Sequence, residues 1–230
     1  MSTLIQIRKT LLFPESIKAR LTGVIGILVL ISGSFAQYVK STLVNPQNVI
    51  TTSENFLAYE VLFRYGIIGG LLMAVFFIIY AVRLNIILQT VNQAIAKFML
   101  ILALIPMPIF ILNLLNYYAA FHWAIVGDLQ QIEFFLDLYR QGSLFVSIFF
   151  GLWLLPLGYL ILHSHKIPKF IGVFLMLGST GYIILFFQVF LWPAMELSLW
   201  KNPYLVVTHL AELSLMLWLL IMGEPKFEPS

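Results

Sequence analysis

Six apolar runs, each long enough to cross a bilayer, constrain this chain more than any other feature. Each run holds roughly 20 mostly apolar residues, the length of helix that spans a hydrocarbon core. The runs show no alternation with a period of two and are too long for barrel strands, so they favour helices. We therefore predict an all-α, polytopic membrane helix bundle with six transmembrane helices. The predicted spans are 21–39, 58–82, 97–119, 142–163, 169–191 and 203–222.

Composition supports the same fold class. Of the 230 residues, 61% are hydrophobic and 10% are charged, whereas a soluble domain has about 25% charged residues. A chain of this length has too little interior to hide so much apolar surface from water. This excludes an ordinary soluble protein, a disordered chain and a basic nucleic-acid-binding module. The chain has no cysteine, which excludes disulfides, thiolate metal sites and a cysteine nucleophile.

The segments outside the spans are expected to be connections. Residues 1–20 form a predicted cytoplasmic amphipathic lead-in at the interface, 21–223 form the transmembrane domain, and 224–230 form a cytoplasmic tail. The first loop, from Lys40 to Phe56, is rich in Ser, Thr, Asn and Pro. The longest break covers 120–141, and its "LQQIEFFLDLYRQ" portion favours a short surface helix leading into the fourth span.

The first span shares features with a secretory signal peptide. Basic residues and an apolar run precede "SGSFAQ", which resembles a cleavage site after Ala36. The basic lead-in is long for the charged region of a signal peptide, so we expect a retained helix.

The distribution of basic residues predicts the orientation. If the N-terminus is cytoplasmic, nine of the 13 Lys and Arg residues fall in cytoplasmic segments and three in external ones, with Arg64 inside a span. The positive-inside rule therefore places both termini in the cytoplasm. The cytoplasmic set is Arg8, Lys9, Lys18, Arg20, Arg83, Lys97, Lys166, Lys169 and Lys226.

Polar side chains within the spans gather in their outer halves under this orientation. Ionisable groups inside a bilayer are costly and usually face a bundle interior or a wet cavity. We therefore expect a polar binding pocket that opens toward the outer leaflet. Its predicted residues are Glu60, Arg64, Asn113, Asn116, Tyr182, His209 and Glu212.

Each of these candidates also has a structural interpretation. Glu60 and Arg64 are spaced i,i+4, so they can pair on one helix face or reach the headgroups together. Asn113 and Asn116 can hydrogen-bond between helices without binding a ligand. Glu212 fits either a buried polar network or ligand site, or a solvated carboxylate at the interface. Its i,i+3 spacing from His209 suits a metal, but further ligands are not evident, so we predict no metal site.

Small residues and prolines predict how the spans pack. The glycines permit close approach between helix backbones, and Pro106 and Pro108 are expected to kink the third span. The glycines concerned are Gly66, Gly69, Gly70, Gly172, Gly178 and Gly181.

Catalytic motifs are missing from the sequence. It contains no Walker loop, no HExxH and no GxSxG, and His209 is the histidine clearly placed inside a span. We therefore predict no catalytic residue and name no cofactor.

The order of several short motifs resembles a known family. They are "RLTGVIGILVL" at 20–30, "LFRYGI" at 62–67, "VNQAIA" at 91–96, "LNLL" at 112–115, "GSLFVSIFFGLWLLPLGYLILHSHKIPKFIGVFLMLGSTGYII" in the fourth and fifth spans, and "LAELSLMLWLLIMG" in the sixth. Together they resemble a bacterial six-helix membrane family catalogued as a domain of unknown function, over about 18–223. The "HSHK" segment differs from the connection between the fourth and fifth spans that this family leads us to expect, which is a serine followed by small apolar residues. The resemblance points to Arg64, Asn92, Asn113, Gly151, Gly158, Tyr159, Pro168, Gly181, Tyr182, Glu212 and Trp218, but it implies no activity.

The function expected from these features is that of a non-enzymatic membrane component. Short loops and no catalytic constellation favour an accessory or assembly subunit of a larger membrane complex. The alternative is a small transporter or lipid-handling enzyme in which Arg64 and Glu212 share the outward-opening pocket. Expected partners are membrane lipids and either partner membrane subunits or further copies of the chain, with no nucleic acid. The expected location is a bacterial inner membrane.

Overall fold

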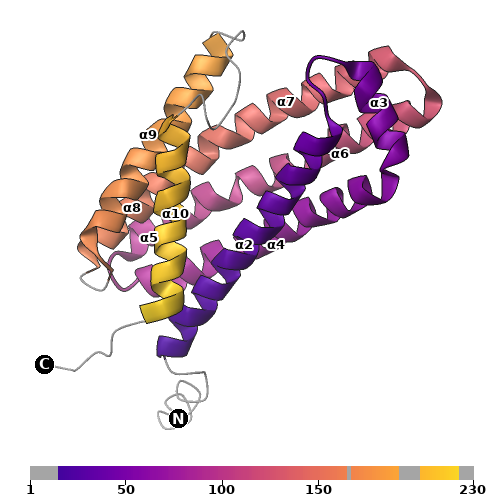
Figure 1. Ribbon diagram of the computed structural model, residues 1–230. Coiled ribbons are helices and arrows are strands. Elements are labelled where there is room, and N and C mark those ends of the chain that lie inside the picture. The colour runs from indigo at the N-terminus through magenta and orange to yellow at the C-terminus, as the bar shows by residue number, and fades with distance from the viewer. Residues whose placement is uncertain (1–14, 165–166, 192–202, 223–230) are drawn as a thin grey trace, which may run out of the picture.

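The computed structural model describes residues 15–164, 167–191 and 203–222, and every regular element in these ranges is an α-helix (Figure 1). The helices pack side by side in a bundle. The start of α2 and the end of α10 lie at the same end of this bundle, at the bottom of Figure 1. Their bounds are α2 Glu15–Leu43, α3 Val49–Ala58, α4 Glu60–Leu88, α5 Gln93–Leu104, α6 Pro106–Val126, α7 Leu129–Leu152, α8 Leu154–His163, α9 Lys169–Leu191 and α10 Pro203–Met222.

Five of the spans are long and apolar enough to cross a membrane. They are Ala19–Leu43, Glu60–Leu88, Gln93–Val126, Leu129–His163 and Lys169–Leu191, and Val206–Met222 is a shorter apolar helix. The prediction of an all-helical membrane bundle is confirmed. The observed helices contain each predicted span almost entirely and extend several of them at one or both ends.

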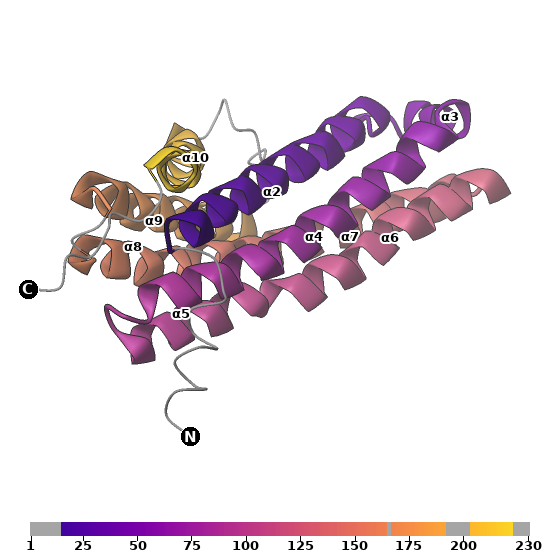
Figure 2. The same ribbon diagram turned by 90° about the horizontal axis from the view of Figure 1, so that it is seen from below.

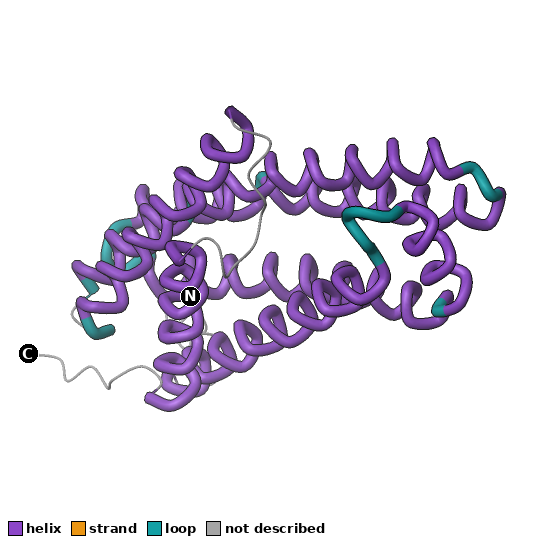
Figure 3. The backbone as a smooth tube through the Cα atoms, turned by 45° about the horizontal axis from the view of Figure 1, so that its top comes forward, coloured by secondary structure: helices purple, strands orange, loops and turns teal. Residues whose placement is uncertain are grey.

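Polar residues set the helix starts. Asn48, Asn92 and Asp128 precede α3, α5 and α7, and the side chain of each accepts a hydrogen bond from the backbone N–H three residues later. Such caps satisfy an N–H group that the first turn of a helix leaves free. Gly127 ends α6 in the left-handed region, at φ 86°, which glycine adopts without steric cost. The teal connections in Figure 3 are accordingly short.

Of two expectations about the connections, one is wrong and one is confirmed. The segment between Lys40 and Phe56 is not all loop, because α3 begins at Val49. Its polar residues are cap and turn residues: the Asn45 N–H donates to Thr52 Oγ1 at 2.9 Å. The helix expected over "LQQIEFFLDLYRQ" is present: it forms the first part of α7 and leads without a break into the fourth span.

Prolines divide two long spans. The third span breaks at Ile105, as Pro106 and Pro108 predict, and Leu104, the last residue of α5, is four residues before Pro108. The fourth span breaks at Trp153, and Leu152, the last residue of α7, is four residues before Pro156. A proline removes the hydrogen bond to the carbonyl four residues earlier and clashes with it. The second break was not predicted.

The bundle has two hydrophobic cores. The proximal core joins the second half of α4 to α5, α8, α9 and α10, around Tyr80 and Trp153. The distal core joins the end of α2, α3, the start of α4, α6 and α7, around Phe56. We call this second part the distal arm: α3, residues 117–126 of α6, residues 129–143 of α7 and the adjoining ends of α2 and α4. Figures 1 and 2 show it reaching away from α8, α9 and α10.

Glycines let neighbouring helices touch, as predicted. A Cβ at Gly66 would lie 2.7 Å from Val39 Cγ1 on α2, and one at Gly178 would lie 2.9 Å from Thr208 Cα on α10. A Cβ at Gly172 would lie 2.8 Å from the Gly158 carbonyl oxygen on α8. Helix α2 packs against both α4 and α10, so the first span is a component of the bundle in this structure.

Several predictions concern residues that the structure does not describe. The amphipathic lead-in over 1–20 is described only from residue 15, where α2 begins, and the tail at 224–230 lies outside the described residues. Lys166 and the connection between the fifth and sixth spans also lie outside them.

Candidate functional site

Glu60 and Arg64 form an ion pair on the surface of the distal arm. Arg64 Nη2 and Nε lie 2.6 and 2.9 Å from Glu60 Oε1, which confirms the predicted i,i+4 pairing. The side chain of Arg64 is 54% exposed and that of Glu60 is 47% exposed. An ion pair exposed to this degree contributes about 0–1 kcal/mol to stability. The guanidinium also lies 5.9 Å from the centre of the Phe121 ring.

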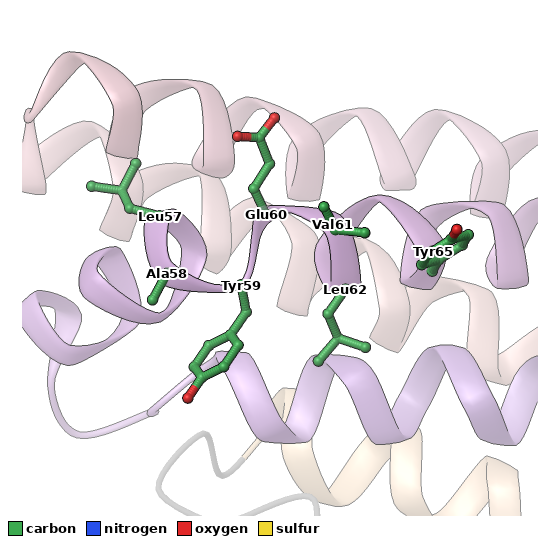
Figure 4. A pocket seen from close by; sticks show the side chains of 7 residues that line it. All are labelled: Leu57, Ala58, Tyr59, Glu60, Val61, Leu62 and Tyr65. Carbon is green, nitrogen blue, oxygen red and sulfur yellow. The ribbon is translucent and has the colours of Figure 1, made fainter.

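A shallow depression lies beside this pair where α3 meets α4. It is lined by Leu57, Ala58, Tyr59, Glu60, Val61, Leu62 and Tyr65. Figure 4 shows Tyr59 and Leu62 on one side of the chain and the Glu60 carboxylate pointing to the other. The lining is mostly apolar and open, so it does not form an enclosed binding site.

Asn113 and Asn116 lie between α6 and α7 at the base of the distal arm. Asn113 is buried, and its Nδ2 donates to the Tyr139 carbonyl at 2.8 Å and to Ser143 Oγ at 3.1 Å. Asn116 Nδ2 donates to Asn113 Oδ1 at 3.1 Å. A Cβ at Gly142 would collide with the Asn113 amide, so the glycine makes room for it. These contacts hold two helices together, which matches the structural interpretation of the asparagines.

Tyr182, His209 and Glu212 lie together where α9 and α10 pack. The rings of Tyr182 and His209 are 6.4 Å apart, and Glu212 interacts electrostatically with both Tyr182 and Tyr80 of α4. Glu212 and Tyr182 are half-buried, and His209 is exposed. Thr208 Oγ1 next to them donates to the Gly178 carbonyl at 2.9 Å and joins the two helices.

The structure does not bring the two ends of the predicted pocket together. Glu212 interacts with Tyr80, which is 16 residues beyond Arg64 on the same helix α4, a rise of about 24 Å. Glu212 also occupies the tenth position of the 20-residue α10, close to the middle of this helix. The seven predicted residues therefore form three separate contact groups, and a shared ligand pocket stays a prediction.

Several residues implied by the family resemblance have packing or capping roles. Asn92 caps α5, and Gly158 lies against Gly172. The Gly151 carbonyl accepts from Ser179 Oγ at 2.7 Å, and a Cβ at Gly151 would lie 2.8 Å from Tyr182 Cβ. These contacts explain the residue types without a ligand.

Sequence reasoning missed several polar contacts. Lys40 Nζ lies 5.5 Å from the centre of the Tyr139 ring, and Tyr80, in the second half of α4, interacts electrostatically with Glu212. These residues come together only because particular faces of different helices meet. The position of a residue along its span does not show which neighbouring helix its side chain faces.

The described residues contain no group of three or more His, Cys, Asp or Glu side chains that could hold a metal ion. His209 and Glu212 therefore have no third ligand of these types within the described ranges. No nucleophile with an adjacent base is found among the contacts described above.

Comparison with known proteins identifies the family. The family described as "Domain of unknown function (DUF4386)" matches residues 21–223. A curated relative named "Uncharacterized protein", from the archaeon Archaeoglobus fulgidus, is 29% identical over 159 residues, which are 69% of this chain and 84% of that protein. No solved structure matches.

Proposed function

Since the chain belongs to the DUF4386 family of membrane proteins, we propose that it is a non-enzymatic accessory or assembly subunit that binds another membrane protein through its distal arm. The observation that carries this proposal is the length of the arm. The third and fourth spans have 34 and 35 residues, whereas α9 has 23. A helical span that is about a dozen residues longer than the hydrocarbon core requires extends about 18 Å beyond that core.

The surface of this extension is mixed. Exposed Glu133, Asp137 and Arg140 on α7 favour an aqueous or headgroup environment. Ile125, Val126 and Leu129 at the α6–α7 corner are nevertheless exposed, the first two by 57% and 58%. We call these three residues the apolar tip. Apolar side chains grouped on a surface that lipid does not cover are typical of a protein interface.

The alternative function has less support. A transporter or lipid-handling enzyme that combines Arg64 with Glu212 needs both side chains in one site, but about 24 Å of α4 separates Arg64 from the level of Glu212. In addition, Arg64 already pairs with Glu60.

The apolar tip provides a direct test of the proposal. In the double variant Ile125→Ser/Val126→Ser, we expect about tenfold less partner per chain after extraction in mild detergent, because buried apolar anchors carry most interface energy. Glu133→Ser, also exposed on the arm, is the matched control and should retain the partner. Equal recovery of a stoichiometric partner from both variants contradicts docking at the tip.

We further propose a cytoplasmic membrane location with both termini inside, which places the distal arm outside. The chain has no cysteine, so single cysteines report accessibility without background. We expect Glu133→Cys on the arm to react with a membrane-impermeant maleimide in intact cells. Gln93→Cys, exposed at the opposite end of the bundle, should react only after permeabilisation. The reverse pattern would show that the orientation is inverted.

A further inference from the structure

Lys40 lies at the base of the distal arm, with its ammonium group over an aromatic ring. It is in the last turn of α2 and is half-buried. Its Nζ lies 5.5 Å from the centre of the Tyr139 ring on α7. A lysine is rarely taken out of water unless its charge is balanced, and the face of a phenol ring balances it only in part. The position therefore favours an anion beside the ammonium group.

The length of the first span places Lys40 at one edge of the hydrocarbon core. Thr22, near the start of this span at Ala19, accepts a hydrogen bond at 3.3 Å from Arg83 Nε of α4. Lys40 is 18 residues beyond Thr22, a rise of about 27 Å. A hydrocarbon core is about 30 Å thick. Lys40 and Arg83 therefore lie near opposite edges of it.

The third and fourth spans indicate the same level. Asn113 is 20 residues from the start of the third span at Gln93. Ser143 is 20 residues from the end of the fourth span at His163. Each separation is about 30 Å of helix, and the two residues meet, since Asn113 Nδ2 donates to Ser143 Oγ at 3.1 Å. Tyr139, one turn beyond Ser143, thus lies at the level of the lipid headgroups.

The hydroxyl group of Tyr117 belongs to the same cluster. The ring centres of Tyr117 and Tyr139 are 5.1 Å apart, and Tyr117 is 3% exposed. Among the residues that the structure describes, this hydroxyl has no hydrogen-bond partner. Buried polar groups are nearly always hydrogen-bonded to protein or to a bound molecule. The hydroxyl therefore favours a polar ligand atom in the cluster.

We propose that Lys40 and Tyr117 bind a phosphate group at the base of the distal arm. The Lys40 ammonium group supplies the positive charge, and the Tyr117 hydroxyl donates a second hydrogen bond. The segment that carries Tyr139 is fixed, because its carbonyl oxygen accepts from Asn113 Nδ2 and from Ser143 Oγ, both at 2.8 Å. The level of the site favours the headgroup of an anionic phospholipid as the source of the phosphate. No partner protein is needed, since both donors belong to this chain.

Native mass spectrometry of the delipidated full-length chain in detergent tests this site, with dioleoylphosphatidylglycerol as the probe. We expect a lipid to bind wild type and to bind Lys40→Gln about tenfold more weakly, because a charged hydrogen bond is lost. Lys40→Arg keeps a cation and should retain most of the binding. Tyr117→Phe keeps the ring and loses only the hydroxyl, so we expect binding about threefold to tenfold weaker.

Arg64→Gln is the matched control. Arg64 is 19 residues from Arg83 on α4, so it lies near the level of Lys40, but it already pairs with Glu60. This variant should bind the lipid as wild type does. Equal loss of binding in Arg64→Gln and Lys40→Gln would show a general attraction between cations and lipid and would overturn the site.

Inorganic phosphate distinguishes the two sources of the ligand. Binding of inorganic phosphate alone to the lipid-free chain, lost in Lys40→Gln, would assign the site to free phosphate and overturn the lipid headgroup. Wild type that binds neither probe overturns the proposal, as does wild-type binding by Lys40→Gln. Should Lys40→Gln fail to fold, Tyr117→Phe decides: weaker binding supports the site, and unchanged binding overturns it.

Discussion

Replacement of Phe56 by Ala is expected to loosen the distal arm by about 3–5 kcal/mol, the usual cost of removing a fully buried aromatic side chain. Phe56 has no exposed surface. Its ring centre lies 5.3 Å from Phe63, 5.8 Å from Tyr117 and 6.1 Å from Phe121. It therefore joins α3 to α4 and α6 at once, and α3 has only ten residues of its own. A helix that short does not persist without packing.

Hydrogen exchange of the backbone amides of α3 measures this effect. In Phe56→Ala we expect α3 to exchange faster by two or more orders of magnitude, since 1.4 kcal/mol corresponds to a factor of ten. The matched control is Leu57→Ala, because Leu57 is adjacent and 52% exposed. If both variants protect α3 like wild type, the distal core does not hold the arm together.

The second large effect is expected at the contact between α2 and α10. A Cβ at Gly23 would collide with the backbone N of Leu220 and would lie 2.7 Å from its Cα. Backbone atoms cannot move aside as a flexible side chain can, so Gly23→Ala must separate the two helices. We expect a cost of about 2–3 kcal/mol, typical of overpacking, and a Tm about 4–12 °C lower for a chain of this size.

Gly33 on the same helix provides the control. A Cβ at Gly33 would lie 3.1 Å from Met73 Cγ, and methionine is unbranched and adapts to added volume. Gly33→Ala should therefore change the Tm by no more than a few degrees. Equal loss of stability in both variants would show that the backbone contact at Gly23 has no special role.

The helical spans could be predicted from sequence because their cause is local. An apolar run of about 20 residues must form a helix in lipid to satisfy its own backbone. The break at Ile105 could also be predicted from a local cause, because Pro106 and Pro108 cannot complete the hydrogen bonds of the helix. Pro156 carries the same signal for Trp153, and the prediction overlooked it. The helix α3 was harder to predict, because Asn45, Asn48 and Thr52 are typical of loops and also of helix caps.

The candidate site could be predicted only in part, because it depends on which helix faces meet. The spacing of Glu60 and Arg64 within one helix predicted their pairing correctly. Depth alone placed Arg64 and Glu212 at one level, whereas Glu212 interacts electrostatically with Tyr80, 16 residues beyond Arg64 on α4. The partners of Asn113 on α7 likewise follow from the contact between α6 and α7, which the sequence does not specify.

Native mass measurement of the particle extracted from membranes tests the central claim most directly. The claim is that this chain works in assembly with a different membrane protein, bound at the distal arm. We predict a stoichiometric complex of the chain with at least one other polytopic protein. A particle that contains the chain alone, as a monomer or a homo-oligomer with retained lipid, would contradict the claim.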